Sequence, residues 1–241
     1  SKVAMFPLYY SFHYNYLFGW FHKKFIKVFK YKNFIFNVND VEIPLTYYSS
    51  FIFKTYELND RILLEKNLTA QHKCIIIGGG IGFIPTIVNN ITKNKVLIFE
   101  INNKIIKNLK SNLINNKIKF KILNYNLLLN KTDIQEYYYS NENFLATSMF
   151  RKSKKKIKLK NILFNKVKNI NDFNTLIIDG EGIEKHYIEN IKILKKVKFI
   201  FFEFHNDIFT NVQKSEIFKK LKQEGFFLKD KFINSYYFIK H

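Results

Sequence analysis

Short apolar runs alternate with amphipathic segments from residue 74 to the end of the chain. Runs of this kind are typical of strands buried on both faces of a sheet. We expect strands in the segments Cys74–Ile77, Lys95–Phe99, Lys117–Leu123, Thr175–Asp179 and Phe199–Phe204. Apolar residues at helical spacing predict helices over 83–91, 103–115, 183–196 and 214–225. Strands and helices that alternate with short connections predict an α/β fold, a doubly wound and mostly parallel sheet covered on both faces.

The two ends of the chain carry other patterns. Gly225–Ile239 predicts a final antiparallel strand pair, so the last strand should run against the others. Phe34–Leu45 alternates apolar and polar residues, which predicts a hairpin that turns at Asn39–Asp40, and Tyr56–Leu68 has helical spacing. We therefore expect an aromatic and basic N-terminal extension (1–33), a hairpin and helix lead-in (34–70) and the main domain (71–241).

The composition indicates which kinds of partner the chain could attract. The 241 residues carry a formal charge of +21, which attracts phosphates, nucleic acid or an anionic membrane, although lysine spread along a chain usually forms solvated faces. The stretch 4–32 is aromatic and then basic, which suits peripheral contact with a membrane interface, packing on the parent domain or a homo-oligomer contact. No secretory signal is visible, and Cys74 is the single cysteine, so a reducing cytoplasm is the expected compartment.

Four glycines follow the first predicted strand in the segment CIIIGGGIGFIP, namely Gly78, Gly79, Gly80 and Gly82. A phosphate-binding P-loop requires Lys and then Ser or Thr after its last glycine, and these are absent here. The dinucleotide fingerprint requires a small third residue, where this chain has Phe83. A backbone this bare suits a bulky ligand without phosphate, such as S-adenosylmethionine. Glu100 ends the second strand, where a carboxylate can accept hydrogen bonds from both ribose hydroxyls.

Several ordered motifs resemble the FkbM family of S-adenosylmethionine-dependent methyltransferases over about residues 34–230. The motifs are IIGGGIG, FE at 99–100, ATSM at 146–149, IIDGEGIE at 177–184 and FFEFH at 201–205. The resemblance implies a Rossmann-like methyltransferase sheet, S-adenosylmethionine as the cofactor and O-methylation of a hydroxyl, most plausibly on a sugar or glycan. The family usually has an acid where this chain has Ile76 and a lysine where it has Ile177.

These motifs give three groups of candidate site residues. The cofactor set is Gly78, Gly79, Gly80, Gly82, Glu100, Ile101 and Asn124, the last of these at the end of the third strand. The catalytic set is Asp179, Glu181 and His205, because a base within reach of the acceptor hydroxyl helps to remove its proton. The acceptor set is Ser148, Glu184 and Glu203. Asp179 or Glu181 could alternatively cap the helix near Ile183, and His205 could be a satisfied strand-end histidine.

Other functions stay open at this point. Asp179 with Glu203, His205 or Asn206 could hold Mg²⁺, although the resemblance does not require a metal. Lysines that alternate with apolar residues in 151–160 suggest either a solvated edge strand or a surface for an anionic acceptor. The high charge raises two further alternatives, a nucleic-acid methyltransferase or an inactive, membrane-associated binding protein that keeps the fold. No recognised RNA-binding module or base-methylation motif is present, so nucleic acid is the less favoured partner.

Overall fold

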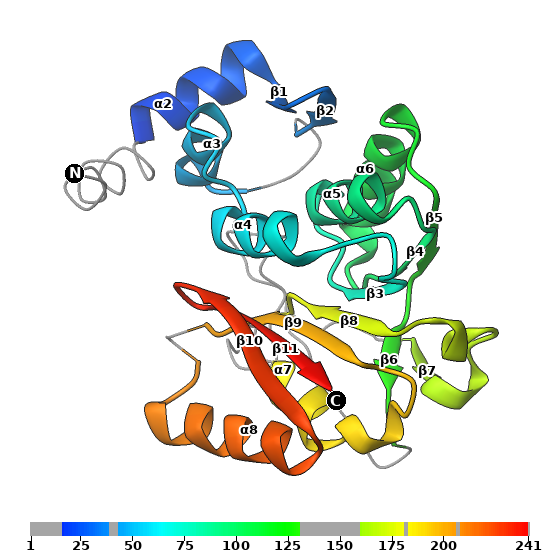
Figure 1. Cartoon of the computed structure of the whole chain (residues 1–241). Helices are drawn as coiled ribbons and strands as arrows, with labels where there is room; N and C mark the ends of the chain where they lie inside the picture. Colours follow the sequence, from blue (N-terminus) through cyan, green and yellow to red (C-terminus); the bar gives the residue numbers. More distant parts are fainter. Residues whose placement is uncertain (1–15, 39–42, 131–159, 181–182, 206–207, 241) are drawn as a thin grey trace.

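The computed structural model describes residues 16–38, 43–130, 160–180, 183–205 and 208–240. A seven-stranded sheet forms its centre, in the order β10-β11-β9-β8-β3-β4-β5 (Figure 1). Its strands are β3 (Cys74–Ile77), β4 (Val96–Phe99), β5 (Phe120–Leu123), β8 (Thr175–Ile178), β9 (Phe199–Glu203), β10 (Phe226–Phe232) and β11 (Ser235–Lys240). Strands β5, β4, β3, β8 and β9 pair in parallel, and β11 pairs antiparallel with both β9 and β10. The predicted fold class and the antiparallel last strand are therefore confirmed.

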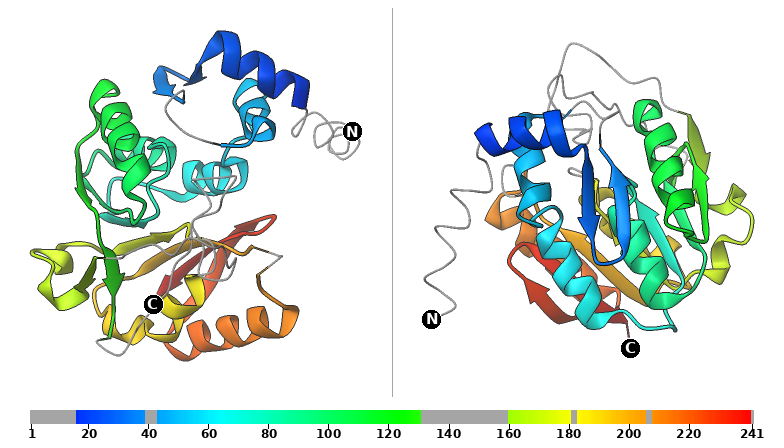
Figure 2. Two further views of the ribbon diagram at one scale, coloured as in Figure 1. Left: turned by 180° about the vertical axis from the view of Figure 1, so that it is seen from behind. Right: turned by 90° about the horizontal axis from the view of Figure 1, so that it is seen from above.

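Helices cover both faces of this sheet (Figures 1 and 2). The helices α4 (Leu58–Asn67), α5 (Phe83–Thr92) and α6 (Asn103–Asn115) lie on one face, and α7 (Glu184–Glu189) and α8 (Asn211–Gln223) lie on the other. Every residue of β3, β4 and β8 is buried, because apolar side chains alternate between the two cores. The sequence pattern of continuous apolar runs follows directly from this double coverage.

The helix predicted over 183–196 is shorter than its pattern suggested. After α7 the chain continues as a short 3₁₀ turn, η4 (Ile191–Ile193). Asn190 separates the two, and its side-chain amide donates to the carbonyl of His186 (3.1 Å) and accepts from Asn130 (2.7 Å). Asparagine competes for backbone partners in this way, which ends helices.

A hairpin precedes the main sheet, and it begins earlier in the sequence than the predicted segment Phe34–Leu45. Strand β1 (Val28–Tyr31) pairs antiparallel with β2 (Phe34–Asn37), and the turn lies at Lys32–Asn33. Strand β1 therefore lies within the predicted N-terminal extension (1–33), and β2 lies just after it. Asn39 and Asp40 themselves lie outside the described residues.

Asparagine side chains of α6 hold the outer edge of β2. Asn112 accepts from the Asn37 amide (2.8 Å) and donates to its carbonyl (3.1 Å). Asn116 makes the same pair of bonds to Ile35, at 2.9 and 2.8 Å. The two asparagines are one helical turn apart, so they match alternate residues of the strand and replace a neighbouring strand.

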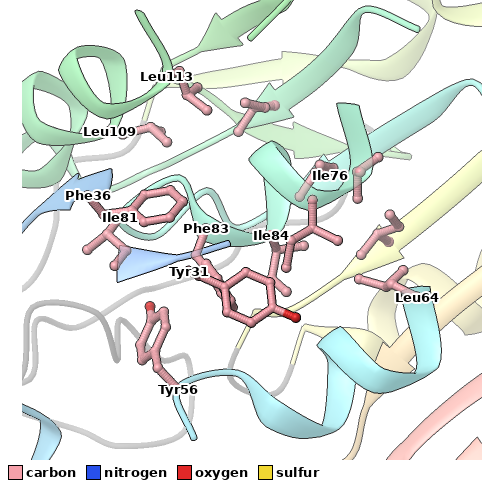
Figure 3. Packing of buried hydrophobic residues seen from close by; sticks show 14 of the residues in the cluster. Tyr31, Phe36, Tyr56, Leu64, Ile76, Ile81, Phe83, Ile84, Leu109 and Leu113 are labelled. Atoms are coloured by element: carbon pink, nitrogen blue, oxygen red, sulfur yellow. The ribbon is translucent and has the colours of Figure 1, made fainter. Parts of the chain in front are cut away.

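Aromatic packing fixes this hairpin over the start of α5. Phe83, the first residue of α5, lies among Tyr31, Phe36 and Tyr56, with ring centroids 5.3, 5.5 and 5.7 Å away (Figure 3). A small residue at position 83 would leave this space empty. Phe83, which does not fit the dinucleotide fingerprint, is therefore a core residue that joins the hairpin to the main domain.

The remaining elements surround this core. They are α2 (Tyr16–Phe21), the π-helix η1 (His22–Ile26), α3 (Leu45–Ile52), the parallel pair β6 (Asn126–Leu128) and β7 (Asn161–Leu163), and the 3₁₀ turns η2 (Phe164–Lys166) and η3 (Ile170–Asp172). The β6–β7 pair was not predicted, because each strand has only three residues and its partner is distant in sequence. Within the described residues, no helix is long and apolar enough to cross a membrane.

Candidate functional site

The glycine loop connects β3 to α5 at the carboxyl edge of the sheet. Gly78, Gly80 and Gly82 have positive φ angles of 93°, 50° and 91°. L-residues with a side chain rarely adopt such angles, which explains the glycines at these three positions. The Gly78 amide donates to the carbonyl of Phe99 at 2.9 Å, so the end of β4 holds the start of the loop.

At most of these glycines, other atoms of the protein occupy the space that a side chain would need. A Cβ on Gly78 would overlap the carbonyl oxygen of Asp179, and a Cβ on Gly79 would lie 2.6 Å from Leu109 of α6. Gly80 differs, because the nearest atom to its Cβ position is the Tyr56 hydroxyl at 3.5 Å. The loop is thus bare mainly because two other elements pack closely against it, and Gly80 is the position where a side chain would enter a less crowded space.

Glu100 points toward this loop from the end of β4. Its Oε2 accepts from the amides of Gly79 (2.8 Å) and Gly80 (3.3 Å), and its Oε1 accepts from the amide of Asn102 (2.8 Å). Burial raises the pKa of this carboxyl, and the backbone amides oppose that rise. Glu100 therefore shapes the loop, and its predicted contact with ribose stays a prediction.

Two other predicted cofactor residues flank Glu100. Asn124 follows β5, and its side-chain amide donates to the Glu100 carbonyl at 2.7 Å, which ties the ends of β4 and β5 together. Ile101 is half-buried and packs on the core that α7 and α8 cover. Both residues lie at the predicted edge of the sheet, beside the loop.

Three of the predicted acceptor and catalytic residues meet at the ends of β8 and β9. Asp179, Glu203 and His205 are half-buried, and one ligand atom from each lies within 4.8 Å of the other two. The carboxyl ends of neighbouring parallel strands share one edge, which explains why residues 24 or more positions apart converge. Carboxylate oxygens and an imidazole at this spacing could act as general bases or hold a cation.

Glu184 lies behind this cluster, at the start of α7. Its side chain is fully buried, and its Oε1 is 3.6 Å from Nε2 of His205, whose own side chain is 16% exposed. Ile183 precedes α7 and provides no side-chain cap. The alternative role of Glu181 as a cap falls outside the described residues. Glu184 thus meets the cluster through His205.

The start of α4 adds acids that the sequence analysis did not predict. Glu57 and Asp60 form a second group with Asp179, again with ligand atoms within 4.8 Å of one another. Asn59 donates to Glu203 at 3.2 Å, and Ser235 at the start of β11 donates to Asp60.

Burial, followed by the charges of Glu203 and Glu57, raises the pKa of Asp60 well above its ordinary value. The only local signal was two acids close together in a chain with 19 acidic residues.

Tyr56 completes the group from the same connection. It is buried against Phe29, Phe51 and Phe83, and its hydroxyl faces Gly80. Burial, with the charges of Glu57 and Asp179, raises the pKa of this phenol well above its usual range. Tyr56 therefore brings a neutral hydroxyl to the space between the glycine loop and the acids.

Some predicted residues lie outside the described part of the chain. These are Glu181, Ser148, Asn206 and the lysine-rich residues 151–159. The two departures from the family pattern are buried in the sheet: Ile76 in β3 and Ile177 in β8 are 0% and 2% exposed. Both belong to the core that α4, α5 and α6 cover.

Comparison with known proteins gives similarity of structure only. No family model matches the sequence, and no curated protein matches it. Among solved structures, the chain is similar to a ribosomal protein L11 methylase from Lactobacillus delbrueckii subsp. bulgaricus (13% identity, 78% of this chain and 80% of that chain, TM-score 0.49). It is also similar to a methyltransferase from Pyrococcus furiosus (12%, 93% and 94%, 0.47) and a SAM-dependent methyltransferase from Aquifex aeolicus (12%, 77% and 92%, 0.45). Similarities this distant do not bear on the reaction of the chain.

Proposed function

We propose that this chain is an S-adenosylmethionine-dependent O-methyltransferase of the FkbM type, which acts on a hydroxyl of a sugar or glycan. The observation that carries the proposal is a convergence at one edge of the sheet. The glycine loop after β3 and Glu100 after β4 lie beside Asp179, Glu203 and His205 after β8 and β9. The residues proposed to bind cofactor and acceptor thus follow neighbouring strands, which supports the proposal.

Within the glycine loop, Gly80 is the position that leaves room for the proposed cofactor. Gly80 borders space that a Cβ would enter, in front of the Tyr56 hydroxyl, and Glu100 is rigidly held next to it. In the proposal, Gly80, Glu100 and Asn124 hold the nucleoside side of S-adenosylmethionine. The bound cofactor supplies an electrophilic methyl group, so the protein mainly has to align the acceptor hydroxyl with it.

In the proposal, the cluster at the ends of β8 and β9 removes the proton of the acceptor hydroxyl. Asp179 and His205 are half-buried and lie together, so either is within reach of a hydroxyl placed between them. The surrounding carboxylates disfavour a free alkoxide, because like charges repel in a partly buried site. We therefore expect proton transfer to a base to accompany methyl transfer rather than to precede it.

The charge of the site also bears on the acceptor. Four carboxylates besides Asp60 lie within or next to the cluster, although the chain as a whole is strongly basic: Glu57, Asp179, Glu184 and Glu203. Phosphates and carboxylates would be repelled there. This favours a neutral sugar hydroxyl over an anionic acceptor or a nucleic-acid backbone.

Binding of S-adenosylhomocysteine to the full chain, measured by calorimetry, tests the first half of the proposal. We expect saturable binding, because the product shares the nucleoside and amino acid parts with the cofactor. No heat of binding at high micromolar concentration would contradict the assignment. A gel shift with RNA at two salt concentrations is the complementary measurement, since phosphate binding falls steeply with salt.

Asp179→Asn tests the second half. The change removes the base and keeps the shape of the side chain, so we expect S-adenosylhomocysteine affinity within about threefold of wild type and methyl transfer to a mixed glycan pool lowered by about 10²–10⁴. Asp172→Asn is the matched control, because Asp172 is exposed in η3, shortly before β8. Equal activity of the two variants would remove Asp179 from the proposed role.

A further inference from the structure

The segment α2–η1 (Tyr16–Ile26) has its apolar residues on the outside. A helix on a protein surface normally turns its large apolar side chains to the core and its polar ones to water. Here Leu17 is 70% exposed, Phe25 58% and Trp20 44%, and Tyr16, Phe21 and Ile26 are exposed as well. Exposed apolar residues grouped on one element mark an interaction surface, unlike single ones scattered over a protein.

The buried side of the same segment explains why the apolar side faces out. Gly19 is buried against α3, where a Cβ would overlap the backbone carbonyl of Leu45. His22 is buried between Tyr48 and Phe51, and its Nε2 is 3.0 Å from the carbonyl of Val28. Because a glycine and a histidine occupy the inner side, α2 lies close against α3 (Figure 2). Phe18 packs on Phe53, and the other large apolar side chains of the segment are exposed.

Lysines of the same segment lie beside the exposed apolar residues, and the described residues 16–38 contain no acid. Lys23, Lys24, Lys27 and Lys30 are exposed, and the sequence has no Asp or Glu before Asp40. The ammonium of Lys24 lies over the ring of Trp20 at 4.9 Å and over that of Phe25 at 5.5 Å. Trp and Tyr rings together with lysine side chains are the residues that settle at the boundary between lipid headgroups and acyl chains.

We propose that α2–η1 is a docking surface for an anionic lipid membrane, on which the protein lies without spanning it. The segment combines the apolar side and the basic rim that interfacial helices use. Charge decides between a membrane and a second copy of the chain. Two copies that met through this surface would bring like-charged lysines together, whereas an anionic bilayer supplies the opposite charge. The proposal does not depend on methyl transfer.

Trp20 provides a direct measurement, because it is the only tryptophan in the chain. The full chain is titrated with vesicles of phosphatidylcholine alone and with vesicles of equal parts phosphatidylcholine and phosphatidylserine. We expect a blue shift of the tryptophan emission and flotation of the protein only with the anionic vesicles. Lys23→Glu with Lys24→Glu should weaken this binding at least tenfold, since each lysine near such a surface contributes about a factor of five. Lys219→Glu with Lys222→Glu, exposed on α8, is the matched control with the same change of net charge.

A second variant tests the apolar contribution separately. Phe25→Ser removes an exposed ring, and we expect it to lower the affinity for the anionic vesicles about tenfold without changing the circular dichroism. Three results would overturn the proposal. The first is an unchanged tryptophan emission with anionic vesicles. The second is an equal loss of binding in both lysine double variants. The third is a dimer that forms with rising protein concentration in the absence of lipid and protects Trp20 from quenching by acrylamide.

Discussion

Glu100→Ala tests whether Glu100 builds the glycine loop. Its carboxylate accepts from the amides of Gly79 and Asn102 at 2.8 Å each, with a longer third bond to Gly80. Hydrogen bonds to a charged group contribute about 1.5–3 kcal/mol each, so the two short bonds contribute about 3–6 kcal/mol. The raised pKa of Glu100 shows that burial of the charge opposes these bonds, but removal of the carboxylate would leave two backbone amides without an acceptor, at a cost of about 1–3 kcal/mol each, which favours the lower end. We expect the free energy of unfolding to fall by about 3 kcal/mol.

Urea unfolding measures that change, and Glu100→Gln refines it. Glutamine keeps one accepting oxygen but turns an NH₂ donor toward the other backbone amide, so it should lose about half of the stabilisation, roughly 1.5 kcal/mol. The affinity for S-adenosylhomocysteine is measured on both variants at a temperature where both are folded. A Glu100→Ala protein as stable as wild type within about 0.5 kcal/mol would refute the loop-building role, and weaker binding alone could then be assigned to ribose.

Three further predictions concern other parts of the chain. Gly80→Ala should cost only about 1 kcal/mol in unfolding experiments, the strain of a positive φ, yet weaken calorimetric binding of S-adenosylhomocysteine at least tenfold; unchanged affinity would place the ligand elsewhere. Because the folded state raises the pKa of Asp60, its contribution to stability is present at low pH and is lost as pH rises through that pKa. Asp60→Asn should therefore raise the free energy of unfolding, measured with urea, more at pH 8 than at pH 5, by about 1.4 kcal/mol for each pH unit between them over which Asp60 is protonated only in the folded state, and an equal gain at both values would contradict this. Gly19→Ala should separate α2 from the Leu45 carbonyl and increase proteolysis near residue 19, with Ser49→Ala in α3 as a control, and an unchanged digestion rate would argue against the close packing.

The central strands β3, β4, β8 and β9 could be predicted because they are almost entirely apolar. Helix α6 was predicted over 103–115 and observed as Asn103–Asn115, since its apolar residues recur on one face from end to end. The hairpin was predicted too late in the sequence. Its strands β1 and β2 are held by α6 asparagines and by Phe83, which local alternation does not show.

The site was predictable in part for a related reason. In a parallel sheet, residues that follow each strand lie at one edge, so Asp179, Glu203 and His205 could be placed together from their order in the chain. Glu57 and Asp60 could not, because they reach the same place from a helix that packs across the strand ends. The sequence also suggested a ligand as the reason for every glycine, whereas Leu109 and the Asp179 backbone account for two of them.

The sequence by itself determined the order of strands and helices, the glycine loop and the acids at the strand ends, because these depend on local hydrophobicity and on backbone freedom. Only the tertiary structure decided that the acids of α4 join this site and which surfaces stay open. Contacts between distant segments, such as α4 over β9 or Gly19 against α3, depend on packing and charge across the fold. Packing of this kind turned the aromatic residues of α2 outward and gathered the acids of a basic chain at one edge of its sheet.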